Sequence, residues 1–380
     1  MFFWHSPGLM TPSNGKRVLL GLSGGVDSSA SAVLLLEAGY EVIGAFMKNW
    51  SGTVAGPSCA DAEKVGEEFS ECGWREERRD AMRVAAELNI PFLTFDFEKE
   101  YREQVVEYLF AEYAAGRTPN PDVMCNKRVK FDLFVKEADK LGCDFVATGH
   151  YARVVCEPAN LRTCEPKILK GNDNNKDQSY FLWAIPPAVL SRVHFPVGHL
   201  PKPEVREIAR RANLLTFDKK DSTGICFVGE VDIREFLQAR LPKDSGPIVT
   251  TDGITIGEHE GLVFYTIGQR HGINVGGGTP YYVVDKKFET KSLIVSSNFH
   301  PALFRRELVA REANWFRLPS SSFRCEARVR YRQPVAWCSV VVQDNGDLHV
   351  TFDDPQRAVT PGQSIVFYDA DDMLGGAVIQ

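Results

Sequence analysis

One short stretch limits the folds open to this chain more than any other: a glycine turn that joins an apolar strand to a helix. Residues 17–22 (RVLLGL) predict a buried strand, and the following SGGVDSS supplies two glycines and three serines. A helical pattern begins at Val26 and stops at Gly39. Such a turn directs free backbone N–H groups and the positive end of a helix to the carboxyl edge of a parallel sheet, where phosphates bind.

The rest of the first 150 residues continues this alternation of apolar runs and helical stretches. The runs EVIGAFM, PFLTFDF and DFVATGH are separated by segments such as ERRDAMRVAAEL, EKEYREQVVEYLFAEYAAG and VKFDLFVKEADKLG. Because strands that alternate with helices pair in parallel, we predict an α/β fold for this part of the chain.

The second half of the chain has a different pattern. A proline-rich passage over residues 184–203 leads into one clear helix, PEVREIARRANLL. Beyond Tyr281 only short strand patterns follow, which predicts a small β-barrel or sandwich. At 380 residues and 44% hydrophobic content, the chain is long enough for two or three domains.

Composition excludes several classes of protein. No run of about 18 apolar residues occurs and the leader lacks the order of a secretory signal, so we expect no membrane association and a cytoplasmic location. The leader also lacks acidic residues, which leaves an organelle as the alternative. Nine cysteines without CxxC spacing predict reduced thiols rather than a disulfide framework or a zinc site.

Charge is distributed unevenly along the chain. The formal net charge of -6 argues against a protein that is basic throughout. Between Pro301 and Gln343, however, eight arginines stand against three acidic residues. This surplus either forms a solvated strand surface or contacts a polyanion on one face of the molecule.

The residues of the glycine turn narrow the kind of phosphate site. The common nucleoside-triphosphate loop needs GxxxxGK[ST], whose lysine reaches the terminal phosphates, and a dinucleotide loop needs GxGxxG. This turn contains no lysine and matches neither pattern. Ser23, Ser28 and Ser29 offer hydroxyl donors, whereas Asp27 offers a carboxylate that repels phosphate unless Mg²⁺ lies between them. The combination indicates pyrophosphate held as a leaving group, with Asp27 as a candidate Mg²⁺ ligand.

At SGGVDSS the sequence resembles the pyrophosphatase-loop ATP enzymes, in which ATP adenylates a carbonyl oxygen and pyrophosphate departs. Further blocks together resemble the tRNA-specific 2-thiouridylases, and the resemblance runs from about residue 17 to the C-terminus. The blocks are GRTPNPDVMCNKRVKF (116–131), FVATGHYAR (145–153), NKDQSYFL (175–182), DSTGICFVGE (221–230) and YTIGQRHG (265–272).

This resemblance implies ATP-dependent transfer of sulfur to C2 of the wobble uridine, position 34, of tRNA. The C2 oxygen is a poor leaving group, and its conversion to an adenylate makes AMP the leaving group instead. Sulfur then arrives as a cysteine persulfide, and a second thiol releases it by thiol–disulfide exchange. Two cysteines, distant in sequence and close in space, are therefore expected.

The candidate pair is Cys125, in PDVMCNKR, and Cys226, in STGICFVG. We expect Cys125 to lie just before a helix, beside Lys127 and Arg128, whose charges lower a thiol pKa. By resemblance Cys125 is the nucleophile and resolving thiol and Cys226 carries the persulfide, with a disulfide between them at one catalytic stage. We interpret the remaining cysteines as packing residues: Cys59, Cys72, Cys143, Cys156, Cys164, Cys325 and Cys338.

Asp122 lies three residues before Cys125, where it either manages a proton and orients the uracil or caps a helix. The resemblance implies that Asn120, Pro121 and Asp122 contact the target base. For ATP it implies Gly21, Leu22, Ser23, Gly24, Gly25, Val26, Asp27 and Ser28, with Met47 and Gly149 at the same edge of the sheet. For tRNA it implies His150, Lys176, Asp177, Gln178, Arg330, Tyr331 and Gln363.

We therefore expect three parts: a Rossmann-like nucleotide-binding catalytic domain (14–232), a small central α+β module (233–284) and a C-terminal β-barrel (285–380). Residues 196–213 are expected to pack with the central module, and residues 221–229 to return to the catalytic domain. The segment after Trp50 lacks the acidic character common in the family, which leaves its contacts open, and residues 1–16 have no assigned counterpart.

The implied cofactors are ATP and Mg²⁺, and the implied partners are tRNA and a sulfur donor, either a cysteine desulfurase or a relay protein. We expect a monomer. Two alternatives remain. Another pyrophosphatase-loop ligase or synthetase, amidating or argininosuccinate-type, would not need Cys125 and Cys226, and a non-catalytic RNA-binding module would release no pyrophosphate. An iron–sulfur cluster on Asp122, Cys125 and Cys226 is chemically conceivable, although CxxC spacing is absent.

Overall fold

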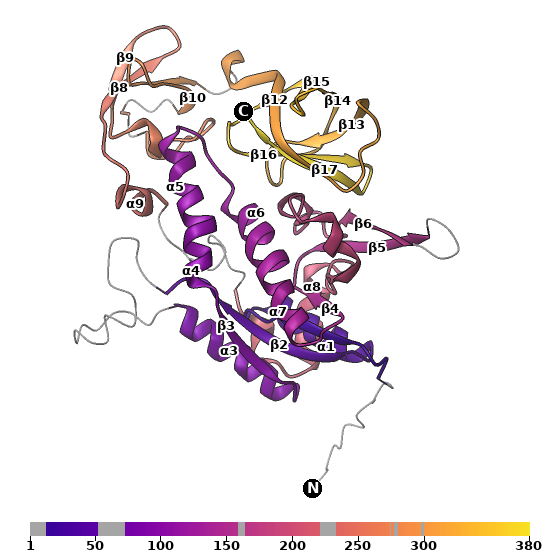
Figure 1. Cartoon of the computed structure of the whole chain (residues 1–380). Helices are drawn as coiled ribbons and strands as arrows, with labels where there is room; N and C mark the ends of the chain where they lie inside the picture. Colours follow the sequence, from indigo (N-terminus) through magenta and orange to yellow (C-terminus); the bar gives the residue numbers. More distant parts are fainter. Residues whose placement is uncertain are drawn as a thin grey trace, which may run out of the picture.

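A computed structural model of the chain describes residues 13–51, 73–158, 164–220, 233–273, 275–276, 280–297 and 300–380. The chain forms a helix-covered sheet at its N-terminal end, with a small central sheet and a β-barrel lying side by side above it (Figure 1). In the part of the chain described, no helix is both long and apolar enough to cross a membrane.

The first part contains a parallel sheet with the strand order β3-β2-β1-β4-β7. The predicted α/β fold is therefore confirmed, and the strands come from the apolar runs that predicted them. A fifth strand, β7, lies within the proline-rich passage. The bounds are β1 (Arg17–Gly21), β2 (Glu41–Lys48), β3 (Phe92–Asp96), β4 (Phe145–Ala147) and β7 (Val193–His194).

Helices cover both faces of this sheet because successive side chains of a buried strand point in opposite directions. On β1, Val18 and Leu20 join one hydrophobic core and Leu19 joins the other. The first core also holds α1 (Val26–Glu37), α3 (Gly73–Glu87) and α8 (Lys202–Arg211). The second holds α4 (Glu98–Tyr101), α5 (Glu107–Ala114), α6 (Pro121–Cys125) and α7 (Phe134–Lys140).

Two of the connections on the second face are π-helical. One (Arg102–Val106) links α4 to α5, and the other (Asn126–Leu133) links α6 to α7. The helix expected to begin after Cys125 therefore starts earlier, at Pro121, where Asn120 caps it. Cys125 lies inside this helical run rather than just before it, which corrects the sequence-based expectation.

The predicted helix at residues 203–215 appears as α8, but it packs differently from our expectation. Its buried side chains Val205, Ile208 and Ala209 share a core with Val26 and Ala30 of α1. Residues 196–213 therefore belong with the nucleotide-binding part and not with the central module, because the apolar side of α8 is matched by α1.

The central part is a four-stranded sheet of order β10-β11-β8-β9, preceded by helix α9 (Ile233–Gln238). Its last strand in sequence, β11, pairs with both β10 and β8. The expected boundary between Val284 and Asp285 therefore cuts through β10, and the central sheet continues to Ser297. The strands are β8 (Gly246–Thr250), β9 (Thr255–His259), β10 (Tyr281–Lys287) and β11 (Ser292–Ser297).

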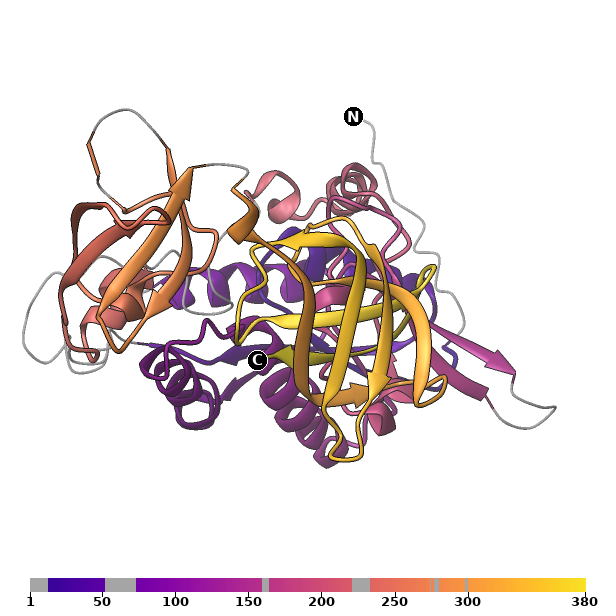
Figure 2. The same cartoon turned by 90° about the horizontal axis from the view of Figure 1, so that it is seen from above.

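The C-terminal part is a closed six-stranded barrel, as predicted, since β12 pairs with both β15 and β17 (Figure 2). A hairpin from the first part, β5 (Ala152–Pro158) and β6 (Cys164–Lys170), extends the barrel sheet by joining β17. The barrel strands are β12 (Phe304–Trp315), β13 (Ser322–Arg328), β14 (Ala336–Val342), β15 (Leu348–Arg357), β16 (Ser364–Asp369) and β17 (Asp372–Ile379).

Candidate functional site

The glycine turn lies between the end of β1 and the start of α1, at the carboxyl edge of the parallel sheet. Gly24 has φ +76°, a conformation that glycine adopts without strain. A Cβ at this position would stand 2.3 Å from the carbonyl oxygen of Glu77 on α3. The turn therefore requires glycine for two independent reasons, one conformational and one steric.

Gly24→Ala is expected to lower the free energy of unfolding by about 1 to 3 kcal/mol, because a left-handed backbone and a collision with Glu77 add together. Gly253→Ala is the matched control: Gly253 also has positive φ, at +85°, but has no atom within 4 Å of the added Cβ. Urea unfolding of both variants measures the difference. Equal losses would show that the contact with α3 is not a constraint.

The serines of the turn form hydrogen bonds within the turn and the first turn of α1. The Ser28 hydroxyl lies 3.1 Å from the Ser23 hydroxyl and accepts a hydrogen bond from the Ser23 backbone N–H. Ser23 is exposed, so its hydroxyl can reach a ligand. Ser29 is buried and donates to the carbonyl oxygen of Gly25 at 2.8 Å. Ser28 donates to the same carbonyl oxygen at 3.0 Å, so the phosphate donor role of Ser28 and Ser29 stays a prediction that requires these bonds to open.

The Asp27 carboxylate is held by two groups from distant segments. The Lys202 ammonium lies 2.7 Å from Oδ1 and 2.9 Å from Oδ2, and the Tyr151 hydroxyl donates to Oδ1 at 2.7 Å. The Lys202 side chain is largely buried, whereas the Asp27 side chain is 33% exposed, so the ion pair is open to a ligand from the Asp27 side. The loop that contains no lysine of its own thus receives one from α8.

These contacts do not fit a magnesium ion held by Asp27, because both carboxylate oxygens already accept hydrogen bonds from Lys202. Within the described ranges, no three His, Cys, Asp or Glu side chains are grouped so that they could hold a metal ion. The expected Mg²⁺ ligand role of Asp27 is therefore not supported by its surroundings.

The other residues expected around the nucleotide converge on this turn. A Cβ at Gly149 would stand 2.7 Å from the Ser28 backbone nitrogen, so the segment after β4 touches the turn directly. A Cβ at Gly21 would stand 3.0 Å from the Met47 methyl group. Leu22 and Val26 are buried, which leaves only their backbones to face a ligand, together with that of Gly25.

The segment expected to contact the target base begins helix α6. Asn120 Oδ1 accepts a hydrogen bond from the Val123 N–H at 3.3 Å, and Pro121 occupies the first helical turn. Asn120, and not Asp122, is therefore the helix cap. The barrel residue Gln363 donates through Nε2 to the carbonyl oxygens of Thr118 and Pro119, at 3.0 and 3.1 Å. Gln363 therefore fixes the chain just before α6 by hydrogen bonds from the barrel.

The Cys125 thiol is fully buried in the core that also contains Met47. Burial raises its pKa to about 12, Lys130 opposes this shift and Asp122 adds to it. The expectation that Lys127 and Arg128 lower this pKa is wrong: Arg128 is exposed, and Lys127 lies in the field of Glu312 on the barrel. Desolvation is the largest effect because the thiol lies inside the protein.

Two residues expected to contact tRNA are interior. His150 is buried between the Thr148 hydroxyl, 2.6 Å from Nδ1, and the Lys130 ammonium, 3.4 Å from Nε2. Burial, with a smaller effect from Lys130, lowers its pKa well below the usual value. Asp177 is buried, accepts hydrogen bonds from backbone N–H groups and pairs with Arg328 at 3.3 Å. Neither side chain faces outward.

Of the remaining tRNA candidates, Arg330 and Tyr331 of the barrel contact other parts of the chain, whereas Lys176 and Gln178 belong to the first part. Arg330 is half-buried and donates to the carbonyl oxygen of Ile267 at 3.4 Å, and the Tyr331 ring lies 4.4 Å from that of Phe181. Gln178 accepts a hydrogen bond from the Tyr151 N–H at 3.0 Å. Lys176 is half-buried. Most of these side chains already have hydrogen bonds or ring contacts within the protein.

The predicted persulfide carrier, Cys226, lies outside the described residues, as do Cys59 and Cys72. Cys143, Cys325 and Cys338 are buried free thiols, in agreement with the packing role expected of them. Cys325 and Cys338 face each other across β13 and β14, with their sulfurs 3.9 Å apart. Cys156, expected to be a reduced packing residue, is instead disulfide-bonded.

Two lysines that contact the glycine turn and Asp27 were not predicted from the sequence. Lys202 is 175 positions from Asp27, and Lys219 donates to the carbonyl oxygen of Gly24 at 3.1 Å and pairs with Asp80 at 2.7 Å. One signal was available for Lys202. It stands at the positive N-terminal end of α8, where a cation is unfavourable unless an anion lies nearby.

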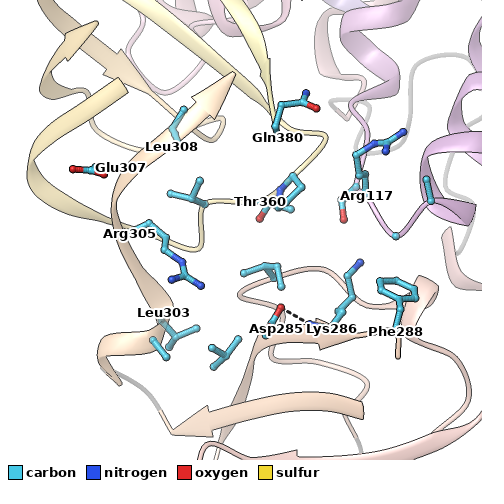
Figure 3. A pocket seen from close by; sticks show the side chains of 18 residues that line it. Arg117, Asp285, Lys286, Phe288, Leu303, Arg305, Glu307, Leu308, Thr360 and Gln380 are labelled. Carbon is cyan, nitrogen blue, oxygen red and sulfur yellow. Dashed lines mark hydrogen bonds between the residues drawn. The ribbon is translucent and has the colours of Figure 1, made fainter. Parts of the chain in front are cut away.

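A separate pocket of about 410 Å³ lies where the three parts meet (Figure 3). It is lined by Arg117 and Thr118 before α6, Lys286 and Phe288 of the central part, and Arg305 of the barrel. Burial lowers the pKa of Lys286 to about 8. Neither Asp27 nor Cys125 lines this pocket, so it is distinct from the glycine turn and the buried thiol.

Comparisons with family models cover nearly the whole chain. Residues 16–230 match the tRNA methyl transferase HUP domain, residues 234–297 the tRNA methyl transferase PRC-barrel domain, and residues 305–379 the aminomethyltransferase β-barrel domain. These limits agree with the strand pairing, which keeps β10 and β11 in the central sheet.

Curated relatives are similar over almost their full length. The tRNA-specific 2-thiouridylase MnmA of Streptococcus mutans is 48% identical over 97% of this chain and 96% of its own. The MnmA proteins of Shouchella clausii and Geobacillus thermodenitrificans are also 48% identical, over 97% and 96% of this chain and 98% and 94% of their own.

Solved structures are more distant. A 4-thiouridine synthetase in complex with RNA and ATP has a TM-score of 0.36 and 20% identity, covering 60% of this chain and 51% of its own. The NMN synthetase of Francisella tularensis has a TM-score of 0.33 and 17% identity, covering 57% and 71%. At these scores neither structure carries an argument about this chain.

Proposed function

Because the chain belongs to the tRNA-specific 2-thiouridylase family and is therefore a tRNA uridine sulfurtransferase, we propose that it acts on C2 of the wobble uridine, position 34. The reaction uses ATP and proceeds through an adenylated uridine and a cysteine persulfide. Cys226 carries the persulfide and Cys125 is the nucleophile that completes the transfer.

One observation supports this assignment above the others: a single short segment joins the glycine turn to the helix that bears Cys125. Gly149 packs against the backbone of Ser28, and Tyr151 donates to Asp27. Between them, His150 contacts Lys130, five residues after Cys125. A nucleotide bound at the turn and a base held beside Cys125 would therefore share one rigid connection.

The nucleotide site combines the turn with Lys202. The N–H groups at the start of α1 and the exposed Ser23 hydroxyl bind the pyrophosphate end of ATP. On ATP binding, the Lys202 ammonium exchanges Asp27 for a phosphate oxygen and neutralises the charge that develops on pyrophosphate. Any Mg²⁺ reaches the site with the phosphates, and it can contact Asp27 only after Lys202 has left that carboxylate.

The bonds change in three steps. The C2 oxygen of uridine attacks the α-phosphorus of ATP, and pyrophosphate leaves. The terminal sulfur of the Cys226 persulfide attacks C2, and AMP leaves with the former C2 oxygen. The Cys125 thiolate then attacks the Cys226 sulfur, which frees the thiocarbonyl and leaves a Cys125–Cys226 disulfide for a thiol reductant to open.

The proposed reaction needs two macromolecular partners. One is tRNA, for which Lys176 and Arg330 supply positive charge beside the catalytic part. The other is a cysteine desulfurase or a sulfur-relay protein, because the chain itself has no source of sulfane sulfur. We propose that the chain acts as a monomer, with Asn120, Pro121 and Asp122 beside the target base.

Mass spectrometry of nucleosides tests the proposal. Unmodified tRNA is incubated with the protein, Mg-ATP, a cysteine desulfurase and cysteine. We expect 2-thiouridine to form only when ATP is present, and Cys226→Ser to abolish it while ATP binding persists, because serine cannot carry sulfane sulfur.

The control is Cys338→Ser, which alters a thiol in the barrel core, remote from the turn. It is expected to retain product formation. Cleavage of ATP to AMP and pyrophosphate without thiolation, despite an active desulfurase and added relay proteins, would contradict the proposal and favour an ATP-dependent ligase.

A further inference from the structure

The Cys125 thiol must ionise to act as a nucleophile, but its burial disfavours the thiolate. A nucleophilic cysteine reacts as the thiolate, yet complete burial raises the pKa of Cys125 to about 12. Among the described residues, the charged groups acting on this thiol are Lys130, which favours the thiolate, and Asp122, which opposes it. The reactivity of Cys125 therefore depends on where these two side chains are held.

The π-helical turn decides the position of Lys130. In an α-helix a residue five positions on is rotated by about 140° from the first, onto another face. The segment Asn126–Leu133 is π-helical, and Phe131 within it departs from helical geometry, with φ -115° and ψ 19°. Because hydrogen bonds in a π-helix join residues five apart, Lys130 returns to the side of Cys125.

Lys130 is also largely buried, and one of its contacts is a histidine. It is 7% exposed, and its ammonium lies 3.4 Å from Nε2 of His150. The pKa of His150 is well below its usual value, so the imidazole is neutral and adds no second positive charge.

The two basic residues nearest to Cys125 in sequence do not serve this purpose. Arg128 is exposed. Lys127 is half-buried, and the acidic group acting on it is Glu312 of the barrel. The positive charge that reaches the thiol therefore comes from Lys130, which an α-helical reading of the sequence would place on another face.

We propose that Lys130 is a positioning residue that makes the Cys125 thiol reactive by holding an ammonium on its side of the helix. The π-helical turn brings it there, and neutral His150, itself in contact with Thr148, holds the ammonium through its Nε2 atom at 3.4 Å. Asp122 opposes Lys130, so any process that withdraws its negative charge strengthens the effect. This inference rests on the proposed nucleophile role of Cys125.

Alkylation of Cys125 by iodoacetamide tests the inference in the full chain, without tRNA or ATP. Mass spectrometry of the Cys125 peptide gives the rate between pH 7 and pH 9.5. We expect Lys130→Met to slow alkylation about tenfold at each pH, since an opposite charge lowers a pKa by about one unit or more. Lys130→Arg is expected to restore most of the rate.

The matched control is Lys136→Met, in the same helical run, where the lysine side chain is 60% exposed and pairs with Asp132. It is expected to leave the rate unchanged. The direction of the change separates charge from packing, because a loosened structure exposes the thiol and accelerates alkylation. If Lys130→Met does not fold, Lys130→Gln provides the measurement.

Unchanged or faster alkylation in both Lys130→Met and Lys130→Gln would overturn the inference, and so would a failure of Lys130→Arg to restore the rate. The result is independent of the reaction itself. Full thiolation by Cys125→Ala would remove the proposed nucleophile role, whereas the alkylation rates would still report whether Lys130 controls the thiol.

Discussion

Lys202→Met is expected to reduce tRNA-dependent pyrophosphate release by at least about 100-fold, because the other ammonium at the glycine turn, that of Lys219, is already paired with Asp80 and bound to the Gly24 carbonyl oxygen. In the parent chain Lys202 binds both oxygens of Asp27. Methionine keeps the length of the side chain and its packing against Tyr151 but removes the charge. The measurement is pyrophosphate released per minute in the presence of unmodified tRNA and ATP.

Arg210→Met is the control for this variant. Arg210 lies on the same helix, is 60% exposed and pairs only within the helix, with Glu207, among the contacts described. It is expected to keep the parent rate within about twofold, as surface substitutions usually do. A Lys202→Met protein that is folded by circular dichroism and releases pyrophosphate at the parent rate would remove Lys202 from the nucleotide site.

Cys125→Ser is expected to lower 2-thiouridine formation by at least about 1000-fold while tRNA-dependent pyrophosphate release continues. The hydroxyl has nearly the same size, so the core around Cys125 stays filled, but it cannot exchange with a persulfide. In the proposed reaction, adenylation precedes this step and does not use the thiol. Nucleoside mass spectrometry and pyrophosphate release, measured on the same samples, separate the two stages.

Cys143→Ser provides the comparison, because Cys143 is another buried free thiol of the same part of the chain. It is expected to form product at close to the parent rate. Thiolation by Cys125→Ser within about threefold of this control would show that Cys125 only packs the core, and the role of resolving thiol would have to pass to another cysteine.

Much of the fold could be predicted because its signals are local. The strand at residues 17–21 and the helix starting at Val26 follow from hydrophobic periodicity on either side of a glycine turn. The barrel follows from a succession of short strands after residue 300. The boundary of the central sheet was misplaced because strand patterns do not show which strands pair.

The glycine positions of the candidate site could be predicted from sequence because they depend on backbone geometry. The pKa of the thiol and the exposure of the tRNA candidates could not, because they depend on burial. The need for glycine at Gly24 and Gly149 is visible in the motif, and the structure adds the collisions with Glu77 and Ser28 that explain it. The pKa direction at Cys125 was wrong because neighbours in sequence were taken as neighbours in space. His150 and Asp177 were expected to contact tRNA, and the structure shows that both are buried.

The sequence by itself determined the order of strand, turn and helix, the choice of residues in SGGVDSS and the position of Cys125 after Asn120 and Pro121, since each depends on contacts within one short segment. Tertiary structure alone decided that Lys202 reaches Asp27 and that Lys130 shares a side with Cys125. The physical reason is that charge and desolvation act through space, and burial depends on how distant segments pack together.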